Sequence, residues 1–343
     1  MRHVRQARQH PLDSPAVSDA PIFLTGVTGF IGKRLLPLLL AEGRRIHVIV
    51  RDPARLHVPE GAPLRIFSGD IGDSGVVRRA MEGCEEGYHL AAMVQHRKDP
   101  AEYERSNILG TRNVLAAAME LGLSRLVYSS SIIVYANDPS SLKDETARIS
   151  GDAFLGDYHR TKYYAHLEAA RCAAEGLPVI LVMPSSVYGP CDLSDANRVL
   201  AWCRRFKHGW VPHWLPNEGR LVLNVAYGED VAQGILLAMR RGEGGEGYIL
   251  GGENLSIREL MERIGNLAGD TRPFRSFPTG VLEPLAALSE GLAKLTGTRP
   301  LLRRGLVRSM NLPWAFSSDK ARRQLGYTIT PFEKALRATF ESA

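Results

Sequence analysis

The chain has 343 residues, of which 44% are hydrophobic and 23% are charged. This length and composition predict a soluble globular protein with one large domain and a smaller one. No apolar run approaches the ~20 residues that a membrane-spanning helix needs, so we expect no membrane span. The formal net charge of +6 permits attraction to anions, but the basic residues are scattered and lack an aromatic–basic recognition pattern. We therefore expect no nucleic-acid partner.

The N-terminal segment and the cysteines exclude further classes. Residues 1–20 contain Arg2, Arg5 and Arg8 but no continuous apolar stretch. This segment predicts a disordered tail and not a secretory signal, so we expect a cytoplasmic protein. The cysteines form no C-x-x-C pair and have no matching histidine spacing, which argues against a zinc site, any other metal site or a disulfide framework. They are predicted to be reduced and mostly buried thiols: Cys84, Cys172, Cys191 and Cys203.

From Pro21 onward, short apolar runs alternate with helical patterns, which is typical of βαβ units and a parallel sheet. Strands are expected over residues 22–24, 46–50, 64–67, 87–90, 125–129 and 179–183. Helices are expected over residues 33–42, 107–121 and 158–175. Six strands with crossover helices predict an α/β fold of the doubly wound Rossmann type, whose ligand lies at the carboxyl ends of the strands.

After Pro184 the regular alternation ends. A short strand is expected over residues 248–250, and Ser256 is expected to cap a helix that runs through Gly265. We predict a tail over residues 1–20 and a Rossmann cofactor domain with the catalytic residues over 21–184. Residues 185–343 are predicted to form mainly a smaller α+β substrate domain, with some segments returning to the Rossmann sheet.

A glycine-rich turn joins the first strand to the first helix, in the stretch Thr25-Gly26-Val27-Thr28-Gly29-Phe30-Ile31-Gly32. Glycines also make ordinary turns, but a position between a strand and a helix favours a dinucleotide site. Gly26 permits the tight turn, Gly29 lets the backbone approach a pyrophosphate, and Gly32 lets the helix pack closely. The phosphates would then meet the positive end of the helix dipole.

The end of the second strand bears on the choice of cofactor. A carboxylate there binds the ribose 2′-OH of NAD, whereas a 2′-phosphate requires a guanidinium. The strand ends with Arg51 and is followed by Asp52 and Arg55. Arg51 favours NADP(H) over NAD(H), and the alternative is that Asp52 reaches the ribose. Asp70, after the third strand, either binds the adenine amino group or simply caps a turn.

Tyr158 and Lys162 lie one helical turn apart and share a helix face. A neighbouring ammonium is expected to lower the pKa of the phenol, which suits Tyr158 to proton transfer. The third catalytic group should be a hydroxyl after the fifth strand, where Ser131 is our choice and Ser130 the alternative. Asn107 either orients groups near the site or caps its helix.

Together these residues resemble an extended short-chain dehydrogenase/reductase of the epimerase/dehydratase superfamily. The resemblance covers the chain from Pro21 to its end and rests on the glycine turn, His89-Leu90-Ala91-Ala92, Ser129-Ser130-Ser131 with Val134-Tyr135, Tyr158 with Lys162, and Pro184-Ser185-Ser186-Val187-Tyr188-Gly189-Pro190. It implies that the following residues contact the cofactor: Gly26, Thr28, Gly29, Phe30, Ile31, Gly32, Arg51, Asp70, Ile71, Leu90, Ala91, Ala92, Tyr158, Lys162, Pro184, Ser186 and Val187.

Two departures from the superfamily pattern narrow the substrate class. Nucleotide-sugar enzymes of this kind usually carry an arginine in the stretch Arg-Asp-Phe-x-His-Val-Asp-Asp, where it grips the substrate diphosphate. Leu223 occupies that position here, which disfavours a nucleotide sugar. Met183 replaces the arginine of the usual Leu-Arg-Pro segment, which removes a packing or ionic contact but leaves the chemistry intact. The sequences around Asn224, Gly251 and Arg51 are more similar to the dihydroflavonol-reductase-like branch than to the nucleotide-sugar enzymes.

The expected function is an NADP(H)-dependent carbonyl reductase or alcohol dehydrogenase for a small or cyclic apolar substrate. Four aromatic residues either line an apolar pocket or fill a second core: Trp202, Trp210, His213 and Trp214. The loop after the fourth strand is expected to add Gln95, His96 and Arg97 to this pocket. An epimerase or dehydratase with internally recycled hydride remains open, although Ile132 and Ile133 offer no carboxylate for a dehydratase. A non-catalytic NADP-binding protein also remains open. The resemblance implies a possible homodimer through the helices over residues 107–121 and 158–175.

Overall fold

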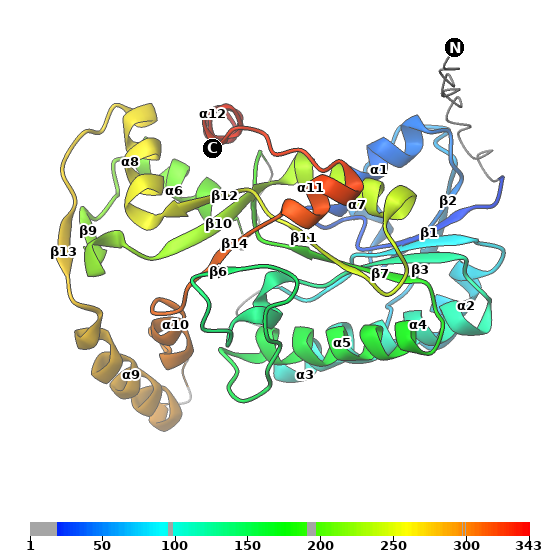
Figure 1. Cartoon of the computed structure of the whole chain (residues 1–343), viewed down its shortest axis with the longest axis horizontal. Helices are drawn as coiled ribbons and strands as arrows, with labels where there is room; N and C mark the ends of the chain where they lie inside the picture. Colours follow the sequence, from blue (N-terminus) through cyan, green and yellow to red (C-terminus); the bar gives the residue numbers. More distant parts are fainter. Residues whose placement is uncertain (1–18, 95–98, 191–196, 297, 299) are drawn as a thin grey trace, which may run out of the picture.

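The computed structural model describes residues 19–94, 99–190, 197–296, 298 and 300–343. A parallel sheet with the strand order β11-β7-β5-β4-β1-β2-β3 runs through the middle of the molecule (Figure 1). Its strands are β1 (Ile22–Thr25), β2 (Ile46–Val50), β3 (Leu64–Ser68), β4 (Glu86–His89), β5 (Arg125–Ser129), β7 (Val179–Pro184) and β11 (Gly247–Leu250). All six strands expected for the sheet are present, which confirms the Rossmann-type α/β fold.

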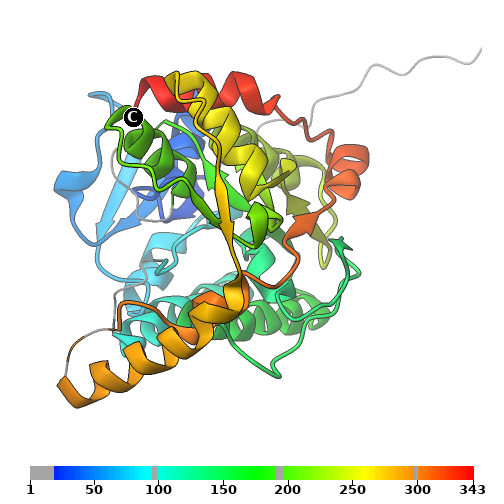
Figure 2. The same cartoon turned by 90° about the vertical axis from the view of Figure 1, so that its left-hand side faces the viewer.

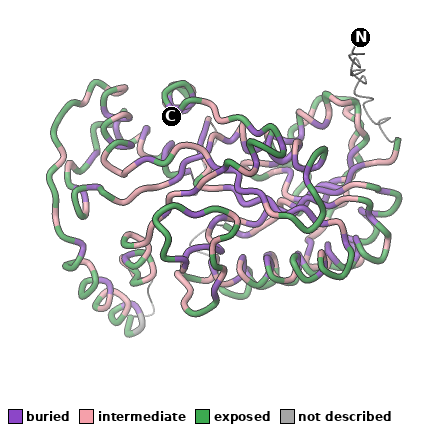
Figure 3. Tube along the Cα trace, viewed as in Figure 1, coloured by how far each residue is buried: buried purple, intermediate pink, exposed green. Residues whose placement is uncertain are grey.

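Helices cover both faces of this sheet. One face is covered by α2 (Ser74–Met81), α4 (Gly110–Glu120) and α5 (Asp157–Ala174), and the other by α1 (Gly32–Ala41), α7 (Gly228–Arg241) and α11 (Asp319–Leu325). Side chains alternate between the two cores along each strand: Phe23 lies in one core, whereas Ile22 and Leu24 lie in the other. The buried positions therefore follow the central strands and the inner faces of the helices (Figure 3).

The strand at one edge of the sheet comes from far along the sequence. The expected strand over residues 248–250 is β11, which pairs in parallel with β7. Every residue of β7 is buried, because helices cover its faces and β11 covers its edge. The C-terminal half of the chain thus completes the sheet that the N-terminal half begins.

A second, smaller sheet has the order β12-β10-β8 and packs against three helices. Its elements are β8 (Ser186–Tyr188), β10 (Val222–Tyr227), β12 (Glu253–Ser256), α6 (Arg198–Lys207), α8 (Ile257–Ala268) and α12 (Phe332–Glu341). Ser256 caps α8 as expected, in a capping box with Glu259. The helix ends at Ala268 and not at Gly265, because Gly269 is the residue that adopts the left-handed conformation.

The remaining elements are short or lie at the periphery. Two strand pairs are β6 (Leu142–Lys143) with β14 (Ala315–Phe316) and β9 (Trp214–Pro216) with β13 (Arg275–Phe277). The short helices are η1 (Pro53–Arg55), α3 (Pro100–Tyr103), the π-helix η2 (Glu104–Leu109), η3 (Ile132–Tyr135), η4 (Asn217–Gly219), η5 (Thr279–Val281) and α10 (Arg304–Ser309). Helix α9 (Leu282–Thr296) extends away from the body (Figure 2).

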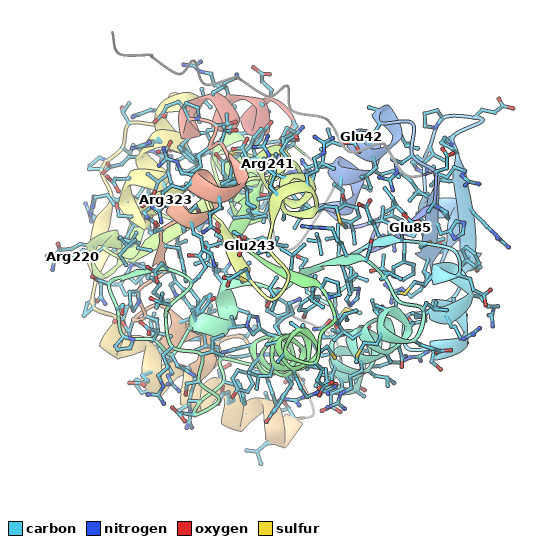
Figure 4. The ribbon with its side chains drawn as sticks, turned by 45° about the vertical axis from the view of Figure 1, so that its right-hand side comes forward. Glu42, Glu85, Arg220, Arg241, Glu243 and Arg323 are labelled. Atoms are coloured by element: carbon cyan, nitrogen blue, oxygen red, sulfur yellow. The ribbon has the colours of Figure 1, made fainter. Side chains whose placement is uncertain are left out.

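The sequence predicted scattered basic residues and mostly buried thiols. Arg220 and Arg323 are exposed and extend from different elements (Figure 4). Cys84, Cys172 and Cys203 are buried and free, and Cys191 lies outside the described residues. Within the described ranges, no helix is long and apolar enough to cross a membrane, and no cluster of metal-ligating side chains is present.

Candidate active site

A cavity of about 2770 Å³ opens at the carboxyl ends of the central strands and continues toward the C-terminal half of the chain. A single small ligand usually occupies about 300–1,000 Å³. The cavity therefore has room for a dinucleotide together with a second molecule. All the predicted catalytic and cofactor-contacting residues line it.

The glycine turn forms one end of the cavity. Gly26 has a φ of 76°, which favours glycine, and a Cβ there would lie 2.6 Å from the Ala91 nitrogen. A Cβ on Gly32 would lie 2.2 Å from the Gly26 carbonyl oxygen, so the first turn of α1 packs directly on the loop. Gly29, in contrast, is exposed and a Cβ there would have one neighbour within 4 Å. Because Gly29 has no side chain, it leaves room for a pyrophosphate to approach the turn, while its own N–H and C=O are hydrogen bonded to Gly26 and Lys33.

The end of β2 distinguishes the two arginines from the aspartate between them. Arg51 and Arg55 are exposed and line the cavity, whereas Asp52 is not among its lining residues. The Asp52 carboxylate accepts the backbone N–H of Ala54 at 3.1 Å and so caps η1. Asp70 lines the cavity while it accepts the Gly72 N–H at 2.8 Å. Its turn-capping role is therefore present, and the same carboxylate lies 3.7 Å from the Arg105 Nε.

The ends of the other strands form the wall between the glycine turn and the catalytic residues. Ile71 follows β3, the segment of Leu90, Ala91 and Ala92 follows β4, and Pro184 ends β7. Ser186 and Val187 belong to β8, which continues this wall. These groups are apolar or neutral, which suits them to contact the flat rings and sugars of a dinucleotide.

Ser131 and Tyr158 meet across the cavity wall. Ser131 is the N-cap of η3, and its side chain lies near enough to the Tyr158 phenol to oppose the rise of the Tyr158 pKa. Ser130, the alternative, is 4% exposed, and its hydroxyl lies 2.9 Å from Nδ1 of His166 on α5. The geometry therefore favours Ser131 over Ser130 as the hydroxyl that shares a substrate oxygen with Tyr158.

Lys162 lies one turn after Tyr158 on α5 and is 2% exposed. Its Nζ donates to the Ser129 carbonyl at 2.7 Å and to the Tyr128 hydroxyl at 3.5 Å. Burial lowers the pKa of Lys162 to about 7. Burial also raises the pKa of Tyr158, and the nearby Ser131 side chain opposes this only in part. The expectation that the ammonium would lower the Tyr158 pKa is wrong for this structure, because desolvation dominates both groups.

Asn107 is 1% exposed and joins three segments behind the site. Its amide accepts the Met93 N–H at 2.6 Å and donates to the Met93 carbonyl at 3.1 Å and to the Thr161 hydroxyl at 3.0 Å. It is not a helix cap, because it lies within η2. Of the two roles that the sequence left open, the orientation of groups beside the site is the one that the contacts support.

A buried chain of polar side chains behind Lys162 was not singled out from the sequence. The Thr111 side chain lies near the Tyr128 hydroxyl and opposes the rise of the Tyr128 pKa that burial causes. The Thr111 Oγ1 lies 3.1 Å from the His89 Nε2. The His89 Nδ1 lies 2.7 Å from the Thr25 Oγ1, which accepts the Ala91 N–H at 3.3 Å. Burial lowers the pKa of His89 to about 3. The signal in the sequence was a histidine inside a strand predicted to be buried, since such a side chain needs polar partners.

The far side of the cavity is mostly apolar. Trp202, Trp214 and Leu223 line it, together with Arg198 at the start of α6. Two other predicted pocket residues do not line it: Trp210 is 81% exposed, and His213 pairs with Asp270 and stacks on Phe274. Three further residues that were predicted at the pocket lie outside the described residues: Gln95, His96 and Arg97.

Comparisons with known proteins identify the family of this chain. A model of the NAD dependent epimerase/dehydratase family matches residues 22–251. The chain is 31% identical over 330 residues to a Synechocystis protein that is named a dihydroflavonol 4-reductase, which covers 94% of this chain and 93% of that protein. It is 30% identical over 325 residues to sterol demethylase protein B of Methylococcus capsulatus, which covers 93% and 96%.

A solved structure is similar to this chain in both fold and sequence. The crystal structure of gox2253 superposes with a TM-score of 0.80 at 30% identity and covers 95% of this chain and 98% of its own. The family match spans the glycine turn, the Ser131–Tyr158 pair and Lys162 in a single segment. The chain therefore belongs to the NAD-dependent epimerase/dehydratase family and is an NAD(P)-dependent oxidoreductase of the extended short-chain dehydrogenase/reductase type, in the dihydroflavonol-reductase-like branch.

Proposed function

We propose that the protein is an NADP(H)-dependent carbonyl reductase or alcohol dehydrogenase that acts on a small or cyclic apolar substrate. The observation that carries this proposal is one cavity that is lined by Ser131, Tyr158 and Lys162 and has an apolar far wall. Leu223 belongs to that wall, where nucleotide-sugar enzymes of this superfamily usually have an arginine. Leucine at this position cannot pair with a diphosphate, which favours another class of substrate.

The names of two relatives support an apolar substrate. One relative is named a dihydroflavonol 4-reductase, and another is named for sterol demethylation. Both names refer to compounds with several fused or linked rings. Aromatic walls formed by Trp202 and Trp214 would pack against such rings.

Residues of the glycine turn and Arg51 would hold the dinucleotide, and the cofactor, when bound, supplies the hydride for the carbonyl carbon. Tyr158 donates its phenolic proton to the carbonyl oxygen and regains it from solvent, while the Ser131 hydroxyl hydrogen bonds to the same oxygen. The raised pKa of Tyr158 keeps the phenol protonated at neutral pH, which suits the reduction direction. Lys162 lies one helical turn after Tyr158 and lines the same cavity, so its Nζ would bind the cofactor ribose.

The NADP preference is part of this proposal. Arg51 and Arg55 face the cavity at the end of β2, and Asp52 is occupied with capping η1. A 2′-phosphate would meet two guanidinium groups there, which favour phosphate through paired hydrogen bonds.

The cellular form of the enzyme is a further part of the proposal. We place it in the cytoplasm as a homodimer, with residues 21–184 as the cofactor domain and 185–343 mainly as the substrate domain. Exposed apolar side chains on the face of α4, η2 and α5 support the dimer: Leu109, Met119, Tyr164 and Leu167. Three buried free thiols are compatible with a reducing compartment.

The experiment that tests the function follows cofactor absorbance while ketones, steroids, flavonoids and sugars are offered. We expect NADPH-dependent reduction of an apolar ketone, and a loss of about 10²–10⁴-fold in kcat for Tyr158→Phe, which removes the proton donor but keeps the ring. Binding of NADPH should persist in this variant. Turnover of a sugar nucleotide without net cofactor oxidation would overturn the proposal in favour of an epimerase.

A further inference from the structure

The buried polar chain behind Lys162 extends from the catalytic lysine to the loop that carries the cofactor residues. Its contacts cross α5, β5, α4, β4 and β1 in that order, and each of its side chains is at most 2% exposed: Lys162, Tyr128, Thr111, His89 and Thr25. The Ala91 N–H, next to the glycine turn, ends the chain at Thr25. Three of its contacts are direct and join Lys162 to Tyr128, Thr111 to His89, and His89 to Thr25. Between them, the Thr111 side chain lies near enough to the Tyr128 hydroxyl to oppose the rise of its pKa.

Every group in the middle of this chain can either donate or accept. The hydroxyls of Tyr128, Thr111 and Thr25 do both, and a neutral histidine carries one ring hydrogen that can lie on Nδ1 or Nε2. Burial lowers the pKa of His89 to about 3, so His89 is neutral at ordinary pH. The direction of the hydrogens is therefore set by the groups at the two ends.

Lys162 is the end that can change. As an ammonium it has three hydrogens and no lone pair, so it donates to Tyr128, Tyr128 donates to Thr111, and Thr111 donates to the His89 Nε2. The His89 hydrogen then lies on Nδ1. As a neutral amine, Lys162 has a lone pair that accepts from Tyr128, and every hydrogen in the chain points the other way. The His89 hydrogen then lies on Nε2.

We propose that Tyr128, Thr111 and His89 are positioning residues that keep the Lys162 amine hydrogen bonded in both of its charge states by reversing the direction of one buried hydrogen-bond chain. The two states differ by a single proton, which Lys162 exchanges with the cavity that it lines. All other hydrogens of the chain are conserved. The proposal rests on the proposed function only in taking Lys162 as a catalytic residue.

Both charge states are accessible near neutrality, because burial lowers the pKa of Lys162 to about 7. The other titratable groups near Nζ do not change their charge near neutral pH. Tyr158 has a raised pKa and is neutral, and burial lowers the pKa of His166 to about 4, so it is neutral as well. A lysine surrounded only by carbonyl oxygens would leave its lone pair without a donor whenever it lost its proton, at a cost of about 1–3 kcal/mol.

The test is a pH titration of the ring nitrogens of His89 by ¹⁵N NMR in the full-length protein, without substrate or cofactor. We expect the ring hydrogen to move from Nδ1 at low pH to Nε2 at high pH, with a midpoint close to the Lys162 pKa of about 7. His166 is the control in the same spectra, because its Nδ1 contact is with Ser130 and not with the chain. A His89 tautomer that stays the same across this range would overturn the proposal.

Two variants separate the chain from a purely structural role. Lys162→Met removes the titrating end of the chain. Tyr128→Phe removes one hydroxyl but keeps the aromatic ring, whose centroid lies 5.0 Å from the Lys162 Nζ. Each should make the His89 tautomer independent of pH. A pH-dependent His89 in Lys162→Met would overturn the proposal, because the titrating group would then lie elsewhere. The measurement uses no turnover, so it stands apart from any failure of the proposed reaction.

Discussion

Two residues show how burial and exposure select opposite roles for basic side chains in one cavity. Lys162 is enclosed, so its charge is costly and its pKa falls to about 7. Arg51 is exposed at the cavity rim, where a guanidinium stays charged and can meet an anion. The sequence pointed to both residues, but the direction of the Tyr158 pKa could not be predicted, because desolvation depends on the packing of distant segments around the pair.

The first prediction concerns Arg51. Arg51→Ala should weaken NADPH binding by about 10–100-fold, since a charged hydrogen bond to phosphate contributes about 1.5–3 kcal/mol. NADH binding should change little. Arg65→Ala is the matched control, because Arg65 is exposed on neighbouring β3 and does not line the cavity. Fluorescence titration with both nucleotides measures the effect, and an equal loss for NADH and NADPH would contradict the proposed phosphate contact.

The second prediction concerns the stability cost of Lys162. Lys162→Met should abolish turnover and yet raise the free energy of unfolding by about 1–4 kcal/mol near neutral pH, because a buried charge is replaced by an apolar chain of similar length. The Lys162 pKa is lowered in the folded state, so the unfolded chain binds more protons between pH 7 and 10.5 and the wild-type protein gains stability as pH rises through this window.

The advantage of Lys162→Met should therefore be largest below pH 7 and shrink toward pH 10.5. Urea denaturation of both proteins across this range checks the sign. A difference between the two proteins that is constant with pH would show that Lys162 does not titrate within the fold.

At the scale of elements, the most regular segments were the most predictable. The bounds of β2 and β5 agree with the sequence prediction to the residue, because each is a short apolar run between clear breaks. The helix expected from residue 107 onward differs: its first part belongs to the π-helix η2, and α4 begins at Gly110. The Asn107 side chain bonds to Met93 and Thr161, and such long-range contacts leave no local pattern in the sequence.

The third prediction compares two helical glycines. Gly32→Ala should destabilise the fold by about 2 kcal/mol or more and abolish dinucleotide binding, because the added Cβ would lie 2.2 Å from the Gly26 carbonyl oxygen. Gly291→Ala in α9 meets nothing within 4 Å and should stabilise the protein by about 0.5–1 kcal/mol through helix propensity. Thermal melts and nucleotide titration test both, and nucleotide binding that survives Gly32→Ala would argue against this turn as the cofactor site.

For the whole molecule, the sequence predicted a Rossmann fold but not how the C-terminal segments are fastened to it. The buried Asn224 side chain donates to the carbonyls of Gly252 and Phe316 and accepts the Gly252 N–H. It therefore joins β10 to the turn before β12 and to β14. These partners are widely separated along the chain, so no pattern within one segment could have predicted them.

The fourth prediction follows from this junction. Asn224→Ala should lower the free energy of unfolding by about 2–4 kcal/mol, because the Gly252 and Phe316 backbone groups lose their buried partners. Asn266→Ala is the control, since Asn266 is exposed on α8. Nucleotide affinity of the folded variant should match that of the wild type. Equal stability of the two variants would show that the junction does not hold the segments together.

The placement of β11 has a consequence for the order of events during synthesis. The cofactor-binding strands emerge from the ribosome early, but the edge of β7 gains its partner only after residue 250 has been made. Until then a strand that is buried along its whole length in the finished protein is an open edge, able to pair with other chains. The interval between the emergence of β7 and of β11 is thus a period in which the nascent chain has an unpaired strand edge that can lead to aggregation.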